Sequence, residues 1–188
     1  IFTPDEGAVV RGVVQLSHGM CEYVERYEEL ARALCDAGLV FCGNDHLGHG
    51  ATALLNREKL GFFGPRGSRK YLVEDLELLR REMAGRYPGV PYFLLGHSMG
   101  SFIARLFAQR FGRTLSGLIL SGTAGRNPAA PLGQALARGV ELVKGPKHIS
   151  HQVYQLANGS FSRAIPGAKT PVDWLSKEEA VCSSYLAD

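Results

Sequence analysis

The sequence predicts an α/β fold built on a mostly parallel sheet with flanking helices. Short, nearly continuous apolar runs at 9–17, 39–45, 92–95 and 115–120 alternate with helical patterns at 27–38, 71–86 and 99–111. This alternation is typical of a parallel sheet that is buried on both faces. The rhythm stops after Gly122, so we expect residues 1–122 to form a core and residues 123–188 a second, helical region.

Each predicted element has a local signature. The run at 9–17 is rich in Val and leads into the loop HGM, and the helix at 27–38 ends at Gly38, which fits a C-cap. The helix at 71–86 is amphipathic because its apolar residues share one face: Leu72, Leu76, Leu79 and Met83. Between them, residues 46–68 are expected to form a glycine-rich loop.

The second region has its own helical patterns. A helix over 131–145 carries one apolar stripe, made of Leu132, Leu136, Val140 and Val143. Such a stripe fits a lid over an apolar pocket and equally an ordinary packing helix. Another helix is expected to begin near Asp173, with Ser176 and Glu179 forming a capping box.

The composition of the chain favours some classes of protein and argues against others. The 188 residues are 45% hydrophobic and 21% charged, which is a globular balance. The 21 basic residues are scattered among 18 acidic ones, and this argues against a nucleic-acid partner. Four cysteines without CxxC spacing indicate a reduced, cytoplasmic protein, and no apolar run has the length of a transmembrane segment.

The stretch GHSMGS, residues 96–101, lies between the strand at 92–95 and the helix at 99–111. A G-x-S-x-G pattern alone is weak evidence, but a strand before it and a helix after it are the context of a nucleophile turn. Gly96 and Gly100 keep side chains out of that tight turn. Ser98, at the N-terminus of the helix, is therefore the candidate catalytic nucleophile.

An acyl-transfer site also needs a second backbone donor for the oxyanion. The candidate is SHGM, residues 17–20, at the carboxyl end of the first strand, where parallel sheets build their sites. The N–H groups of Met20 and Met99 are predicted to converge on one carbonyl oxygen as the oxyanion hole. Gly19 would let the backbone approach closely.

Four stretches together resemble a known family. They are HGMCEYVERY (18–27), NDHLGHG (44–50), GHSMGS (96–101) and DWLSKEE (173–179). They are similar to the α/β-hydrolase superfamily and, within it, to the monoacylglycerol lipase and lysophospholipase-like branch, which is also grouped with serine aminopeptidases. The resemblance implies an α/β-hydrolase fold with a helical cap or lid over 123–188. It also implies ester hydrolysis through an acyl-serine, with no metal and no organic cofactor.

Carried over to this chain, the resemblance implies the same roles for Ser98, Met20 and Met99. The residues implied to shape the site are His18, Gly19, Gly96, His97 and Gly100. Three positions depart from the usual pattern, namely Tyr23 for His, Leu47 for Arg and Ser101 for Gly. These departures bear on substrate preference and leave the reaction type unchanged.

A serine hydroxyl needs a base and an orienting acid, and in this superfamily both follow the serine in the chain. The residues after Ser98 resemble a cap, so we expect the acid and base to lie outside these 188 residues and the chain to be incomplete at both ends. His46 and His49, on a loop near the site, remain the alternatives within the chain. His97 adjoins the serine, but neighbours in a sharp turn point apart.

The first functional hypothesis is a serine ester hydrolase acting on a monoacylglycerol, a lysophospholipid or a similar lipid-like ester. Its cap would accept the acyl chain and contact a membrane surface. The same fold also supports peptidases, thioesterases and acyltransferases. A third reading is a catalytically incomplete chain that serves association through an exposed sheet edge. Oligomeric state and acyl-chain length are not predicted.

Overall fold

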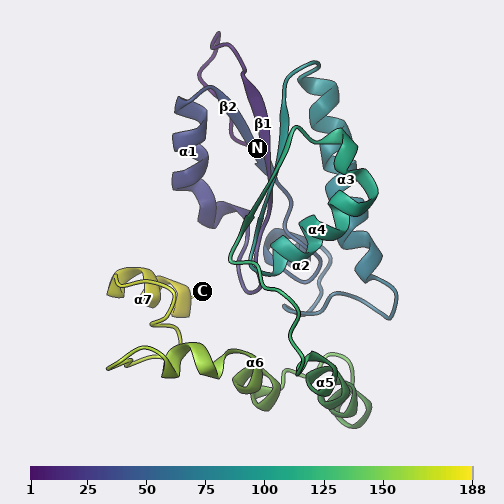
Figure 1. The fold of residues 1–188 in the computed structure, drawn as a ribbon, viewed down its shortest axis with the longest axis vertical. Helices are drawn as coiled ribbons and strands as arrows, with labels where there is room; N and C mark the ends of the chain where they lie inside the picture. Colours follow the sequence, from purple (N-terminus) through teal and green to yellow (C-terminus); the bar gives the residue numbers. More distant parts are fainter. Residues whose placement is uncertain (188) are drawn as a thin grey trace. The chain divides into compact units, whose positions relative to one another are not determined.

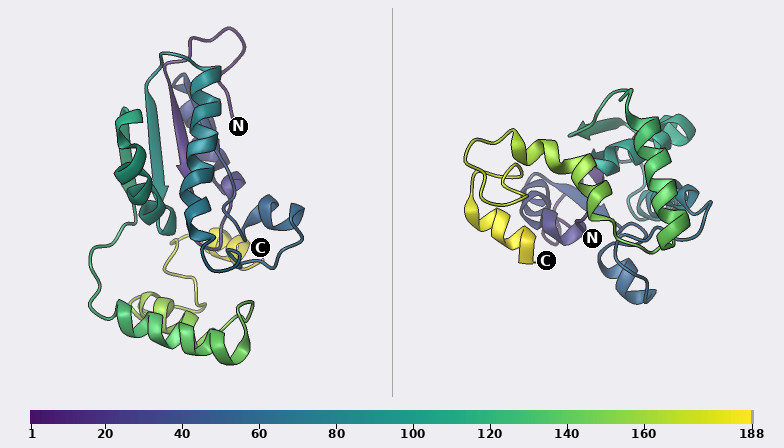
Figure 2. Two further views of the ribbon diagram at one scale, coloured as in Figure 1. Left: turned by 90° about the vertical axis from the view of Figure 1, so that its right-hand side faces the viewer. Right: turned by 90° about the horizontal axis from the view of Figure 1, so that it is seen from below.

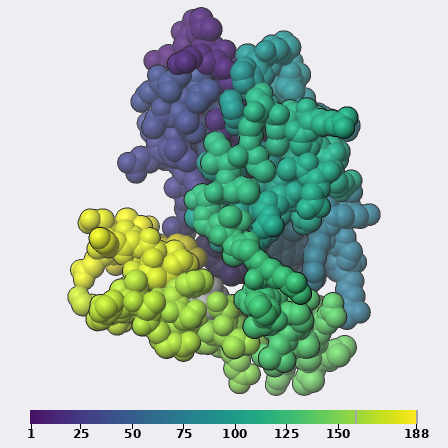
Figure 3. Space-filling model, in the orientation of Figure 1, coloured from purple at the N-terminus to yellow at the C-terminus, as the bar shows by residue number. Residues whose placement is uncertain are grey.

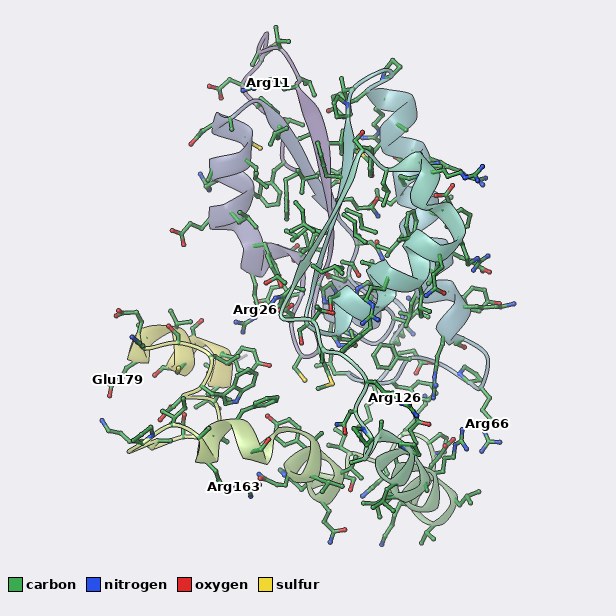
Figure 4. All side chains as sticks on the ribbon, viewed as in Figure 1. Arg11, Arg26, Arg66, Arg126, Arg163 and Glu179 are labelled. Atoms are coloured by element: carbon green, nitrogen blue, oxygen red, sulfur yellow. The ribbon has the colours of Figure 1, made fainter. Side chains whose placement is uncertain are left out.

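The computed structural model describes residues 1–187, and the chain divides into two compact units. Unit 1 is Ile1–Gly125, and unit 2 runs from Arg126, labelled in Figure 4, to Asp188. The division falls three residues after the predicted boundary at Gly122. Asp188, the last residue of the predicted cap, lies outside the described residues.

Unit 1 is built on a parallel sheet whose strands lie in the order β2-β1-β3-β4 (Figure 1). The bounds are β1 Gly12–Ser17, β2 Leu39–Gly43, β3 Tyr92–His97 and β4 Gly117–Ser121. β1 pairs in parallel with both β2 and β3, and β3 pairs in parallel with β4. The predicted parallel sheet is thus confirmed. Before it, Phe2 forms an antiparallel bridge with Phe41 of β2.

Helices cover both faces of the sheet (Figures 1 and 2). Helix α1 (Glu28–Asp36) follows the short 3-10 helix Val24–Tyr27 and packs on one face, while α3 (Arg69–Arg86) and α4 (Met99–Phe111) pack on the other. Each face has its own apolar core. On the α1 side the core is Val14, Leu16, Val24, Ala31 and Phe41, and on the α3–α4 side it includes Leu76, Leu94, Ile103, Ala104 and Phe107.

A buried polar network crosses the interface between the sheet and α3. Gln15 of β1 is 1% exposed, and its Nε2 donates to the carbonyl oxygen of Leu76 at 3.0 Å. The Tyr92 hydroxyl of β3 donates to Gln15 Oε1 at 2.6 Å. Both polar atoms of the Gln15 side chain are therefore satisfied, which is the condition for burying an amide without a large cost.

Two elements of unit 1 differ from the sequence prediction. The loop expected over 46–68 contains a short helix, α2 (Gly50–Leu55), whose start is held because Ala51 N donates to Asp45 Oδ2 at 2.7 Å. β4 begins at Gly117 rather than at 115, because residues 112–114 form a 3-10 turn and Leu115 packs into the core. Tertiary contacts, rather than periodicity, decide both cases.

Unit 2 contains the helices α5 (Ala130–Lys144), α6 (His151–Arg163) and α7 (Glu179–Ala187). The helix expected from Asp173 starts only at Glu179, because the Asp173 carboxylate instead accepts the N–H of Lys169 at 2.6 Å and holds a turn. The predicted capping box does not form. Ser176 Oγ accepts from Glu178 N, and Glu179, labelled in Figure 4, pairs with Lys169 Nζ at 2.9 Å.

Two apolar surfaces are left open. In β4, Leu118, Ile119 and Leu120 are 38%, 48% and 36% exposed. The segment that includes β4 is coloured teal-green in Figure 3. On α5, the predicted stripe lies at the surface, with Leu132 75% and Val143 80% exposed. Among the described helices, none is both long enough and apolar enough to cross a membrane.

Candidate active site

Ser98 occupies the sharp turn between β3 and α4. Its backbone has φ 49° and ψ −119°, in the left-handed half of conformational space that residues with a side chain rarely adopt. The turn is tied to the neighbouring strand because Ser98 N donates to the carbonyl oxygen of Ser121 at 2.9 Å. Backbone strain of this kind is typical of functional turns, and it leaves the Ser98 side chain half-buried at the end of the sheet.

Two glycines allow the close packing that this turn requires. A Cβ atom on Gly96 would lie 2.8 Å from Ala104 Cβ, and also 2.8 Å from backbone atoms of Gly100 and Ser101. A Cβ atom on Gly100 would lie 2.5 Å from the carbonyl oxygen of His18 and closer still to that of Ser17. The end of β1 is therefore pressed directly against the first turn of α4.

The loop after β1 reaches the candidate nucleophile. A Cβ atom on Gly19 would lie 3.2 Å from Ser98 Cβ, so the backbone at Gly19 borders the serine. Met20 follows and is 45% exposed, and Met99 is the first residue of α4. The first N–H groups of a helix have no partner within the helix. Both predicted oxyanion donors thus belong to peptide groups that flank Ser98.

The Glu22 carboxylate holds the loop after β1 in place through hydrogen bonds. Its Oε1 accepts a hydrogen bond from the N–H of Gly19 and another from the Tyr27 hydroxyl at 2.6 Å. Burial raises the pKa of Tyr27 well above its usual value, and the hydrogen bond to Glu22 raises it further. The Tyr27 hydroxyl therefore stays protonated and keeps donating.

The rings of three histidines, His18, His46 and His49, pack against one another beside this loop at tilted angles. The ring centroid of His18 lies 4.2 Å from that of His46 and 5.4 Å from that of His49, and all three side chains are buried. His18 Nε2 accepts the backbone N–H of His46 at 2.9 Å, so the proton of the neutral ring sits on Nδ1 and is donated to the Gly19 carbonyl at 2.8 Å. Burial lowers the pKa of His18 and lowers that of His46 to about 3. His18 and His46 are thus uncharged at neutral pH.

A second serine–histidine contact exists in the chain. Ser17 Oγ lies 3.1 Å from His46 Nε2, which is the spacing of a nucleophile and its base. However, Ser17 is 0% exposed and His46 is 1% exposed, and Ser17 belongs to the regular strand β1. His46 Nδ1 has no hydrogen-bond partner among the described residues, so nothing orients the ring as a base requires. We read this pair as a structural contact.

The predicted site residues gather at the carboxyl ends of β1 and β3, whereas the alternative bases do not bond to Ser98. His46 contacts Ser17 and His18, and His49 Nδ1 lies 3.0 Å from the Leu47 carbonyl. His97 Nδ1 lies 3.3 Å from Ser121 Oγ. Among the described residues, no group of three or more His, Cys, Asp or Glu is placed to hold a metal ion.

Sequence reasoning passed over one residue of the site. Ser101, fully buried in the first turn of α4, donates its hydroxyl to the Ser98 carbonyl oxygen at 2.6 Å. The signal was present in the sequence, because a serine three residues after the N-cap can bond back to its carbonyl. From the sequence alone, Ser101 is only a departure from the family pattern.

The family is established by comparison with known proteins. A family model described as serine aminopeptidase, S33, matches residues 8–188. The monoacylglycerol lipase of Mycolicibacterium smegmatis is 29% identical over 196 residues, covering 100% of this chain and 58% of that protein. Human monoglyceride lipase is 34% identical over 117 residues, covering 58% of this chain and 34% of that protein. The chain thus spans less than two thirds of the length of these relatives.

Solved structures agree with the sequence relatives. A highly thermostable carboxyl esterase from Bacillus coagulans, solved in complex with glycerol, is 35% identical with a TM-score of 0.87, covering 99% of this chain and 59% of that chain. A lipase solved in its open form is 27% identical with a TM-score of 0.81, covering 100% of this chain and 60% of that chain. The chain therefore belongs to the serine aminopeptidase S33 family, in the monoacylglycerol lipase-like branch of the α/β-hydrolases.

Proposed function

We propose that the protein is a serine ester hydrolase that cleaves single-chain lipid esters of the monoacylglycerol type, with Ser98 as its nucleophile. The observation that carries the proposal is the strained backbone of Ser98, with φ 49°, at the N-terminus of α4 and against the loop at Gly19. A residue is held in such a conformation only where the surrounding structure enforces it. The names of its relatives, monoacylglycerol lipase and carboxyl esterase, support the same chemistry.

In the proposed reaction, Ser98 Oγ attacks the ester carbonyl carbon while a base takes the hydroxyl proton. The carbonyl oxygen becomes an oxyanion that the N–H groups of Met20 and Met99 stabilise. Collapse of this intermediate expels the alcohol, which receives the proton, and leaves an acyl-serine. Water then attacks the acyl-serine through the same steps and releases the fatty acid.

We assign the base and its orienting acid to residues outside this chain. The assignment is supported by the four histidines of unit 1, each of which has a bonding partner other than Ser98. His18 uses both of its ring nitrogens, and His46 uses Nε2 on Ser17. His97 and His49 contact Ser121 and Leu47.

We further propose that unit 2 is the cap and binds the acyl chain. The apolar stripe of α5 supports this role, because Leu132, Leu136 and Val143 are 75%, 45% and 80% exposed and available to an apolar ligand. The same apolar stripe on α5 would insert into the surface of a lipid membrane. We also propose a cytoplasmic location, which fits four cysteines without CxxC spacing or a dense disulfide pattern.

The test is intact-mass analysis of the full-length protein, which includes the residues proposed as base and acid, after reaction with a fluorophosphonate probe. One adduct is expected on the wild type and none on Ser98→Ala. As a matched control, Ser17→Ala should keep the adduct, because Ser17 belongs to the structural pair with His46. An adduct that survives Ser98→Ala and is lost in Ser17→Ala would refute the assignment of the nucleophile.

Peptide hydrolysis is the second candidate, and the family description, serine aminopeptidase, is the observation that favours it. A panel of monoacylglycerols of different chain length, run beside aminoacyl amides, separates the two activities. We expect turnover of the esters. Turnover of the amides alone would assign the chain to the peptidases of its family.

A further inference from the structure

The direction of each oxyanion donor is linked to the carbonyl of the same peptide group. Met99 N–H belongs to the peptide that carries the Ser98 carbonyl, and Met20 N–H belongs to the peptide that carries the Gly19 carbonyl. A trans peptide is planar, and its C=O and N–H point in opposite directions. The described residues contain no cis peptide bond. A group that holds the carbonyl therefore also aims the amide.

The Ser98 carbonyl is held by Ser101. It accepts the backbone N–H of Ser101 at 2.9 Å and the Ser101 hydroxyl at 2.6 Å. Both donors lie in the first turn of α4, so they draw the carbonyl toward the helix. Met99 N–H consequently points away from the helix, and the inference requires that a substrate carbonyl meet Ser98 on that side.

The Gly19 carbonyl is held in the same way by His18. His18 Nδ1 donates to it at 2.8 Å, and the N–H of His46 fixes that tautomer by donating to His18 Nε2 at 2.9 Å. On the other side of Gly19, its own N–H is bonded to Glu22 Oε1. The residue before Met20 is thus fixed at both of its backbone polar groups.

We infer that Ser101 and His18 are positioning residues that aim the two oxyanion amides, Met99 and Met20, by hydrogen-bonding the carbonyl of the same peptide group. The inference rests on the proposed function. Ser101 donates its hydrogen bond from α4, and His18 donates from the end of β1. Each oxyanion amide is therefore positioned by a side chain from a different element. Neither side chain touches the substrate.

The first test removes the Ser101 hydroxyl. Ser101→Ala keeps the backbone bond to Ser98, adds no atoms and should remain folded, as circular dichroism will check. We expect kcat on p-nitrophenyl butyrate to fall about 10-fold with KM unchanged, which is less than the 100-fold or more lost with a whole oxyanion donor. Thr114→Val is the matched control, since Thr114 Oγ1 makes the same hydroxyl-to-carbonyl bond to Phe111 at 2.7 Å at the far end of α4. A kcat equal to that of the control would overturn the role of Ser101.

The second test separates the two ring nitrogens of His18. In His18→Asn the side-chain amide can donate from the Nδ1 position to Gly19, and in His18→Gln an oxygen can accept from His46 at the Nε2 position. The inference requires the Asn variant to keep kcat within about threefold of the wild type and the Gln variant to lose about 10-fold, both with unchanged KM. The reverse order would mean that His18 only supports the fold.

The two proposals fail in different ways. A wild-type protein that gains no fluorophosphonate adduct on Ser98 would overturn the proposed function and this inference together. A labelled wild type whose kcat is unaffected by Ser101→Ala, with equal kcat values for His18→Asn and His18→Gln, would overturn the inference alone.

Discussion

Gly100→Ala tests the packing that brings the two halves of the site together. The added Cβ atom would lie 2.5 Å from the His18 carbonyl oxygen and nearer still to that of Ser17, where ordinary contact begins at 3.4 Å. The start of α4 and the end of β1 would have to separate by about 0.9 Å or more, and neither partner is a side chain that can rotate away. We expect a loss of stability of about 3 kcal/mol or more.

The same separation should disable the proposed oxyanion hole, because Met20 follows β1 and Met99 begins α4. A displacement of about 1 Å in a catalytic group can cost about 100-fold in rate. The assays are urea unfolding, for the free energy of unfolding, and hydrolysis of p-nitrophenyl butyrate, for the rate.

Gly85→Ala in α3 is the matched control, since a Cβ atom there meets nothing within 4 Å. It should stabilise the helix by about 0.5–1 kcal/mol and leave the rate unchanged. If Gly100→Ala retains both the stability and the rate of the wild type, the close contact between β1 and α4 is not what positions the amides.

Three further predictions concern stability. Ser98→Gly should be about 1 kcal/mol more stable than Ser98→Ala in urea unfolding, because glycine adopts φ 49° without strain; equal stabilities would mean the turn is unstrained. Tyr92→Phe should cost about 1–3 kcal/mol, since it leaves Gln15 Oε1 buried without its donor, and a neutral result in the same assay would contradict the buried network. Below pH 6.5 the unfolded His46 binds a proton that the folded ring, with its pKa near 3, does not. Stability should therefore fall by about 1.4 kcal/mol per pH unit toward pH 3 from this residue, and His46→Asn should flatten the slope measured by unfolding at several pH values.

Much of the core could be predicted because its signals are local. The turn at Ser98 lies between an adjacent strand and helix, and the apolar face of α3 follows a simple helical period. Helix α2 was not predicted, because its start depends on a hydrogen bond to the carboxylate of Asp45 rather than on an apolar periodicity within the helix. Helix α6 was not predicted either, although its N-cap hydrogen bond, from Val153 N to Ser150 Oγ, is a local signal.

The candidate site was predictable only in part. Adjacent residues identified the peptides at Ser98 and Met20, but the stacking of His18 on His46 depends on the register of β1 against β2, which no local pattern encodes. Ser101 shows the opposite case. Its bond to Ser98 is local, yet its importance appears only when the direction of the Met99 amide is considered.

The pairing of β1 with β3 has a consequence for how the protein acquires its reactivity. The register joins Val13 to Tyr92, so this closure spans a long stretch of chain and must wait until α3 has been made. Contacts of such high sequence separation form late and slowly. Until that closure, Gly19 and Ser98 are not neighbours, so the proposed nucleophile lacks one of its two proposed oxyanion amides. Under the proposed function, a newly made chain therefore carries a serine whose site is incomplete, and the reactivity of Ser98 toward a fluorophosphonate depends on completion of the sheet.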